Sequence, residues 1–311
     1  MATKSPDGHQ KPMRSPLKWI GKTVRQSPAL SRAALYALPD WPVNIRIEPI
    51  GELRIHIRRN RSLWLRPPLT HEWYPLAVLR NFVGPEDTVW DAGANIGLYS
   101  RWIAGHLKAR RVVAFEPMAA NVPELIHNIG IGGIASKVKV VQWALSDFNG
   151  PMEFQVDDVQ SASGSLDSVR RGAASVAREA LRLPPKTETV LSRTIDDLLM
   201  KQELPVPDVM KIDVEGAEFL LLRGGEDFFT RHSPKILIET HGTEVARQCV
   251  EFLLDHGYAV AGCVPETWNA DRHMRLGRGT LPRIQDQYDV HFIAAAKDGA
   301  LIPERLDYSK L

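Results

Sequence analysis

Cysteine is scarce in this chain of 311 residues, and long apolar runs are missing. The two cysteines, Cys249 and Cys263, are too few for a disulfide framework, and no CxxC metal motif occurs. A reducing compartment is therefore favoured, and we expect the cytoplasm. No run of about eighteen apolar residues is found, so no membrane-spanning helix is expected. The N-terminus also lacks the compact apolar stretch of a secretory signal.

A surplus of one charge is lacking as well. The chain has 39 Lys and Arg against 37 Asp and Glu, a formal net charge of +2. This balance excludes a molecule that clamps nucleic acid by its overall charge. Basic residues do gather in residues 8–39, where no acidic residue occurs. That segment favours a solvated basic extension, with contact to a membrane surface or a targeting peptide as alternatives.

The sequence pattern divides the chain into four parts. Alternating apolar residues in 43–65 predict short strands, and Thr70 opens a helical pattern that runs to Phe82. Two segments, called excursions here, interrupt the later alternation of strands and helices, and each is interpreted as a substrate lid or a tolerated insertion. The pattern of residues 169–183, within the first excursion, fits a helix. The expected parts are a basic tail (1–40), N-terminal strands and a helix (41–86), a main domain (87–296, with excursions 159–188 and 265–287) and a C-terminal tail (297–311).

From Asp87 onward, strands alternate with glycine turns and helices, which is typical of parallel βαβ units. Right-handed crossovers then give a doubly wound α/β sheet with helices on both faces. The expected strands are 88–91, 112–115, 138–144, 209–213, 236–239, 259–263 and 290–295. The expected helices include 98–106, 121–129 and 194–200.

The turn after the first of these strands carries the chemistry. Asp91 ends the strand, and Gly93 and Gly97 allow positive φ and close approach of the backbone to a ligand. Glu116 ends the next strand, where Rossmann-like folds place the carboxylate that binds ribose hydroxyls. The spacing is not the GxGxxG of dinucleotide sites, and an acid suits a cationic ligand better than a diphosphate. These features point to S-adenosylmethionine.

Four blocks of sequence resemble the FkbM family of S-adenosylmethionine-dependent methyltransferases. They are DTVWDAGANIGLYS (87–100), VVAFEPMAANVPELIHN (112–128), VVQWALSDFNG (140–150) and PDVMKIDVEGAEFLLLRGG (207–225), with a shorter fifth, KILIETHG (235–242). The resemblance covers about residues 70–295. It implies a class I methyltransferase fold, a Rossmann-like doubly wound sheet of seven mostly parallel strands with the last strand antiparallel.

The resemblance also implies a set of cofactor-binding residues. The loop residues Gly93, Asn95 and Gly97 would shape the cofactor site, Asp91 would face the methionine end and Glu116 would hold the ribose. Trp143 and Ala144, near the end of the third strand, would contact adenine, although Trp143 is equally well an ordinary core tryptophan. Asp213 closes the fourth strand beside the cofactor.

His241, Asp213 and Glu239 are the expected catalytic residues, because strand ends bring them to one edge of the sheet. His241 is the candidate base, since imidazole titrates near neutral pH. A divalent cation held by Asp213 and Glu239 is an alternative, and a structural histidine is another.

The predicted function is methylation of a hydroxyl oxygen on a sugar, glycan or natural-product scaffold, with no nucleic-acid partner. A Rossmann-like binding module without catalysis is the alternative, and a nicotinamide-dependent dehydrogenase fits the glycine spacing poorly. An exocyclic-amine methyltransferase is disfavoured, because no Asn/Asp-Pro-Pro-aromatic motif occurs.

Overall fold

The computed structural model describes residues 39–60, 62–65, 72–157, 163–166, 184, 186–263, 274–281, 283–286 and 290–297. Its centre is a sheet whose strands follow the order β13-β12-β14-β11-β10-β3-β4-β5. Five neighbouring strands are parallel: β3 (Thr88–Ala92), β4 (Arg111–Phe115), β5 (Val138–Val141), β10 (Val209–Ile212) and β11 (Lys235–Glu239). The basic segment 8–39 lies outside the described residues, apart from its last position.

The far side of this sheet is antiparallel. β14 (Phe292–Ala296) runs antiparallel to β11 and to β12 (Ala259–Cys263), and β13 (Met274–Leu276) pairs antiparallel with β12 at the edge. The predicted doubly wound sheet with an antiparallel last strand is thus confirmed. β13 lies in the second excursion of the sequence and adds an eighth strand to the seven that were expected.

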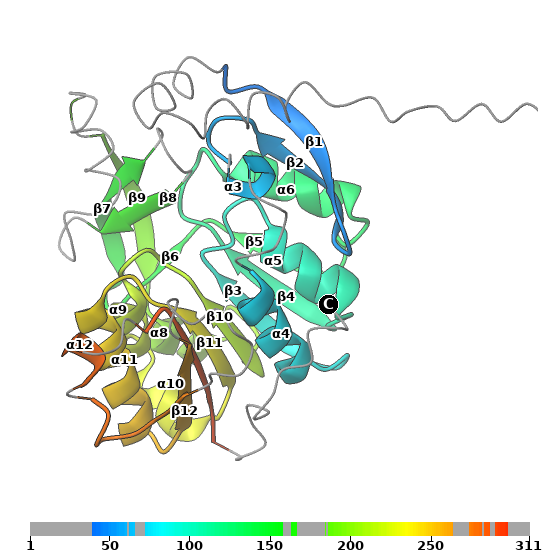
Figure 1. Cartoon of the computed structure of the whole chain (residues 1–311). Helices are drawn as coiled ribbons and strands as arrows, with labels where there is room; N and C mark the ends of the chain where they lie inside the picture. The colour runs from blue at the N-terminus through cyan, green and yellow to red at the C-terminus, as the bar shows by residue number, and fades with distance from the viewer. Residues whose placement is uncertain are drawn as a thin grey trace, which may run out of the picture.

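Helices cover both faces of the sheet (Figure 1). All five residues of β3 and all four of β10 are buried, including Asp91 and Lys211, as strands with two covered faces require. One face carries α4 (Trp73–Phe82), α5 (Leu98–Arg101), its π-helical continuation η1 (Trp102–His106) and α6 (Val122–Ile131). The other carries α8 (Ile195–Met200), α9 (Glu218–Arg223), α10 (Glu226–Arg231) and α11 (Thr243–Asp255), with α12 (Arg283–Asp286) beside α11.

A hairpin precedes the main sheet. β1 (Pro42–Ile47) and β2 (Gly51–His56) pair antiparallel and lie against α6, as Figure 1 shows. The backbone of Arg54 exchanges two hydrogen bonds with the side chain of Asn128, at 2.7 and 2.9 Å. The expected strand at Leu63 to Leu65 is wrong, because Ser62–Leu65 form a helical turn, α3, that starts from the Leu63 N–H to Asn60 O bond.

A second sheet has the order β6-β9-β7-β8 and consists of β6 (Ala144–Leu145), β7 (Gly150–Asp157), β8 (Ser163–Leu166) and β9 (Thr187–Arg193). The strand expected over 138–144 is therefore divided. β5 ends at Val141, and Ala144 pairs with Ser192 of β9 instead of continuing along β4. The helix expected within 169–183 lies outside the described residues. No helix in the described part of the chain is long and apolar enough to cross a membrane.

Candidate functional site

A pocket of about 620 Å³, including its part open to solvent, lies where the parallel strands end. Its walls come from the loops after β3, β4, β5 and β10 and from the second sheet. Ligands of open α/β sheets bind at this carboxyl edge. The lining residues are Ala92, Gly93, Asn95, Phe115, Glu116, Pro117, Met118, Trp143, Ala144, Leu145, Met152, Phe154, Asp213, Val214, Glu215 and Ala217.

The loop after β3 is shaped by positive φ angles. Gly93 has a φ of +79°, and a Cβ there would lie 1.8 Å from the carbonyl oxygen of Asp213, so only glycine fits. Asn95 also has a positive φ, +50°, and both residues line the pocket. Gly97 does not line it: its φ of +91° lets the loop turn into α5 against the side chain of Leu125.

Glu116 is buried in the wall of this pocket. Its carboxylate accepts hydrogen bonds from the backbone N–H of Asn95 at 2.8 Å, the backbone N–H of Met118 at 3.0 Å and the side-chain amide of Asn121 at 3.1 Å. Burial raises the pKa of Glu116 to about 7, against the lowering effect of these three donors. A carboxylate held in this way is fixed in position and keeps lone pairs for hydroxyl donors of a ligand.

Asp91 lies beneath the loop and is not a lining residue. Its carboxylate accepts a hydrogen bond from the Ser100 hydroxyl at 2.6 Å and lies 3.5 Å from the Lys211 ammonium. Two buried oxygens at the loop make no hydrogen bond: Asp91 Oδ1, which has only the ion pair with Lys211, and Asn95 Oδ1. Buried acceptors of this kind call for a donor, and a ligand with ammonium or hydroxyl groups supplies one.

Trp143 and Ala144 line the opposite end of the pocket. The guanidinium group of Arg193 lies 4.8 Å from the ring centroid of Trp143, which fixes the orientation of the indole. Met152 and Phe154 of β7 line the same pocket, a contribution that the sequence analysis missed. The only feature of the sequence that could have indicated this contribution was the alternation of side chains along the strand.

Lys211 joins the cofactor loop to the acidic edge of the sheet. Its ammonium donates to Gly93 O at 3.2 Å, lies 3.3 Å from Asp213 Oδ2 and stands 4.6 Å from the ring centroid of Tyr99. Burial by itself lowers the pKa of Lys211, but the charges of Asp213, Asp91 and Glu239 outweigh it and raise the pKa well above its usual value. Lys211 is therefore a permanent cation.

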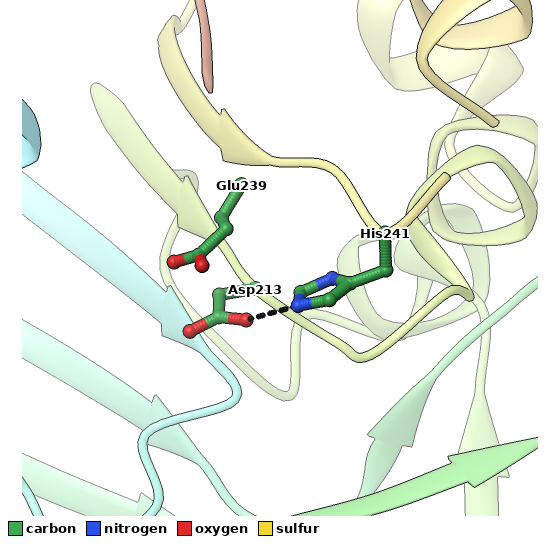
Figure 2. A group of neighbouring side chains, drawn as sticks. All are labelled: Asp213, Glu239 and His241. Carbon is green, nitrogen blue, oxygen red and sulfur yellow. Dashed lines mark ion pairs between the residues drawn. The ribbon is translucent and has the colours of Figure 1, made fainter. Parts of the chain in front are cut away.

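His241 comes close to Asp213 and Glu239, as predicted, and Figure 2 shows its ring pointing toward Asp213. Its Nδ1 lies 2.9 Å from Glu218 Oε1, and its Nε2 lies 3.6 Å from Glu215 Oε2 and 3.9 Å from Asp213 Oδ1. Burial lowers the pKa of His241, but these carboxylates, with the hydrogen bond that Nδ1 donates to Glu218 foremost, raise it to about 10. The ring is thus an imidazolium at neutral pH.

Asp213, Glu239 and His241 are also the one group in the described residues whose oxygen and nitrogen atoms, all within 4.8 Å of one another, have the types that bind a metal ion. Lys211 and the imidazolium of His241 already neutralise part of this negative charge. A third acid, Glu215, faces the same ring; its pKa is raised to about 7 by burial.

Three further polar side chains at this edge, Glu72, Tyr99 and His291, were not predicted from the sequence. Glu72, just before α4, accepts a hydrogen bond from the Tyr99 hydroxyl, and Nε2 of His291 lies 3.1 Å from Glu239 Oε1. His291 had a signal in the sequence: an antiparallel last strand begins where its parallel neighbours end, so the residue before it reaches the same edge. Glu72 had none, because its distance in sequence from the other residues hides the contact.

The strand order, the glycine loop after β3 and the carboxylate after β4 together define a class I methyltransferase fold. The Methyltransferase FkbM domain family matches residues 91–260, and the chain belongs to this family.

Three relatives bear on the function. The AMB antimetabolite synthetase AmbE of Pseudomonas aeruginosa is 30% identical over 207 residues, which cover 57% of this chain and 10% of AmbE. The 31-O-demethyl-FK506 methyltransferase FkbM of Streptomyces tacrolimicus is 28% identical over 57% of this chain and 74% of its own length. The hexuronic acid methyltransferase AglP of Haloferax volcanii is 26% identical over 55% of this chain and 63% of its own length. The match thus spans only a tenth of the first relative.

Proposed function

We propose that this protein transfers a methyl group from S-adenosylmethionine to a hydroxyl oxygen of a sugar, a glycan or a natural-product scaffold. One observation carries the proposal. The pocket at the carboxyl edge combines a ribose-type carboxylate, Glu116, with the unpartnered buried oxygen of Asn95 and an excess of acid at one end. A ligand with vicinal hydroxyls and a cationic end matches all of these groups.

The fit can be assigned residue by residue. Glu116 would hold the ribose hydroxyls, and the indole of Trp143 with Ala144 would contact the adenine ring. Gly93 and Asn95 would line the methionine part, while Gly97 keeps the loop on α6. Asp91 lies beneath the loop and would act on the ligand only indirectly, through its ion pair with Lys211.

The acid excess selects for positive charge. Asp91, Asp213, Glu218 and Glu239 face two cations, Lys211 and His241. Burial first, and then the neighbouring acids, raise the pKa values of Glu72 and Glu215. A cationic group entering the pocket relieves the repulsion.

Methyl transfer asks little chemistry of the protein itself. The bound S-adenosylmethionine supplies a methyl group on a positively charged sulfur. The side chains must hold the acceptor oxygen in line with that methyl group and receive a proton. Asp213 and Glu239 are proposed to orient the acceptor hydroxyl. His241 remains the predicted catalytic imidazole, and its raised pKa suits hydrogen-bond donation to the acceptor at neutral pH better than proton removal.

The acceptor class is suggested by the relatives. One is named for methylation at an oxygen of FK506 and another for a hexuronic acid. Both names describe hydroxylated small molecules or sugars, and the acidic, half-exposed edge around Glu239 and His241 offers hydrogen bonds to such groups.

The test has two parts. Titration calorimetry of the full chain with S-adenosylmethionine and with S-adenosylhomocysteine should give binding of both, and Glu116→Ala should remove it. Incubation with methyl-labelled donor and a panel of sugars, uronic acids and hydroxylated macrolides should then give a labelled ether, identified by mass spectrometry. Lack of heat with either nucleoside contradicts the proposal. Label only in an amine or a ring carbon contradicts the hydroxyl acceptor.

A further inference from the structure

Glu72 is an acid from outside the conserved domain that reaches the catalytic edge. The family match begins at residue 91, whereas Glu72 immediately precedes α4. The carboxyl group is half-buried, and its Oε2 accepts a hydrogen bond from the Tyr99 hydroxyl. Among the described residues, its other oxygen, Oε1, has no hydrogen-bond partner.

The packing of α4 explains how Glu72 arrives there. α4 runs antiparallel to β11: the Lys235 ammonium at the start of β11 donates to Phe82 O at the end of α4, at 3.0 Å. At the other end, the rings of Tyr74 and Phe292 lie 5.5 Å apart, and Phe292 is the register partner of Glu239. The residue two positions before Tyr74 is therefore placed at the Glu239 end of the strand.

The charged groups around Glu72 come from three elements. Tyr99 of α5 donates its hydroxyl, Glu239 ends β11, and Asp213 and Lys211 belong to β10 and the loop after it. Burial, followed by the charges of Glu239 and Asp213, raises the pKa of Glu72 to about 7, against the lowering effect of Tyr99 and Lys211. Such a carboxyl group is about half ionised at neutral pH, the condition that favours general-base catalysis.

We propose that Glu72 is the residue that accepts the proton of the acceptor hydroxyl, an inference that rests on the methyl transfer proposed above. The acceptor oxygen forms a bond to the methyl carbon as the carbon–sulfur bond breaks and sulfur keeps the electron pair. The hydroxyl proton passes to Oε1 of Glu72 and later to solvent. Tyr99 holds the carboxyl group in position through Oε2, so Tyr99 is a positioning residue.

The first test needs no acceptor and reads protons instead of turnover. The donor carries a positive sulfonium and S-adenosylhomocysteine a neutral sulfur, so only the former should lower the pKa of a nearby carboxyl group. Calorimetry in buffers of different ionisation enthalpy at pH 7 should show greater proton release with S-adenosylmethionine, by up to about half a proton from Glu72. Glu72→Gln should reduce this difference.

Glu215 is the matched comparison, because its pKa is also raised to about 7 and it lines the donor pocket. Glu215→Gln removes a separate share of the released protons, which leaves the share of Glu72 measurable. An unchanged proton release in Glu72→Gln overturns the inference and leaves the proposed function standing. If neither nucleoside binds, the proposed function fails and the inference fails with it.

The second test uses the acceptor identified in the labelling panel. Glu72→Gln should lower kcat by about 100-fold or more while the donor Kd changes less than about twofold. Tyr99→Phe removes the donor that lowers the pKa of Glu72, so the rising limb of the pH–rate profile should move to higher pH. Thermal unfolding of each variant checks the fold. Full turnover in a folded Glu72→Gln variant overturns the inference.

Discussion

At the scale of single residues, Trp143 offers the sharpest measure of the cofactor pocket. Arg193 covers its ring at 4.8 Å, and the indole lines the pocket. Trp143→Ala should weaken S-adenosylmethionine binding by about 5- to 100-fold, since stacking of a base on an aromatic side chain contributes roughly 1–3 kcal/mol. Trp143→Phe should keep most of the affinity. Calorimetry measures both.

Trp41 provides the control, because it is 66% exposed on the hairpin side of the molecule. Trp41→Ala should leave the donor Kd unchanged. Equal affinity of Trp143→Ala and the wild type would mean that the indole is an ordinary core residue, the alternative that the sequence left open.

The raised pKa of His241 makes a prediction about stability. Because the folded value, about 10, exceeds the ordinary 6.5, the imidazolium stabilises the fold fully below about pH 6.5, and the gain disappears as the pH rises through 10. His241→Gln should therefore cost on the order of 2–4 kcal/mol near pH 6 and much less near pH 10. Urea unfolding across this range measures the difference.

His232 serves as the control for this experiment, since it is exposed at the end of α10. His232→Gln should show no comparable pH-dependent loss. A constant difference between wild type and His241→Gln from pH 6 to pH 10 would contradict the assigned protonation state.

Residue by residue, the sequence was most informative where chemistry and backbone conformation coincide. Gly93 and Glu116 could be recognised because each stands at a fixed offset from a strand end. Glu72 could not, since its contact with Tyr99 joins segments distant in sequence. The position of Asp91 beneath the loop depends on its pairing with Lys211, which no local pattern records.

At the scale of elements, the turn between β3 and α5 can be tested with a matched pair of glycines. Gly93 and Gly257 have φ angles of +79° and +78°, but only at Gly93 would a Cβ meet another atom, the Asp213 carbonyl. Gly93→Ala should unfold more easily and lose donor binding, because the loop must move off β10. Gly257→Ala should lose only about 1–2 kcal/mol of stability, the cost of a left-handed backbone.

Thermal unfolding and calorimetry of the two variants give the result. Equal loss of stability at both positions would contradict the close packing of the loop on β10, and unchanged donor affinity in Gly93→Ala would separate this loop from the cofactor.

The positions of strands could be predicted from the sequence where the strands are buried. The largely apolar segments of β3, β4 and β10 were recognisable as strands. The division at Val141 was not, because whether Ala144 pairs with β4 or with β9 depends on a partner more than forty residues away. α3 forms where two leucines at alternate positions have the spacing that is typical of a strand.

At the scale of the whole molecule, the strand order decides which residues meet. Placing β3 between β4 and β10 brings Glu116 and Asp213 to either side of the glycine loop, and placing β14 beside β11 brings His291 to Glu239. The alternation of strands and helices, with the handedness of the crossovers, predicted a doubly wound sheet but not the order of its strands. No comparable rule predicted the second sheet, which supplies Met152 and Phe154 to the pocket.

Ligand-dependent unfolding of the full chain tests this arrangement as a unit. A ligand that binds only the folded state at 100 times its Kd stabilises it by about 2.7 kcal/mol, an increase of about 5–11 °C in Tm for a domain of this size. S-adenosylmethionine and S-adenosylhomocysteine should both raise Tm. NAD should not, because its diphosphate would meet the acids Glu116, Asp213 and Glu215 at a loop that lacks the GxGxxG spacing of dinucleotide sites. A shift with NAD alone would favour the dehydrogenase alternative.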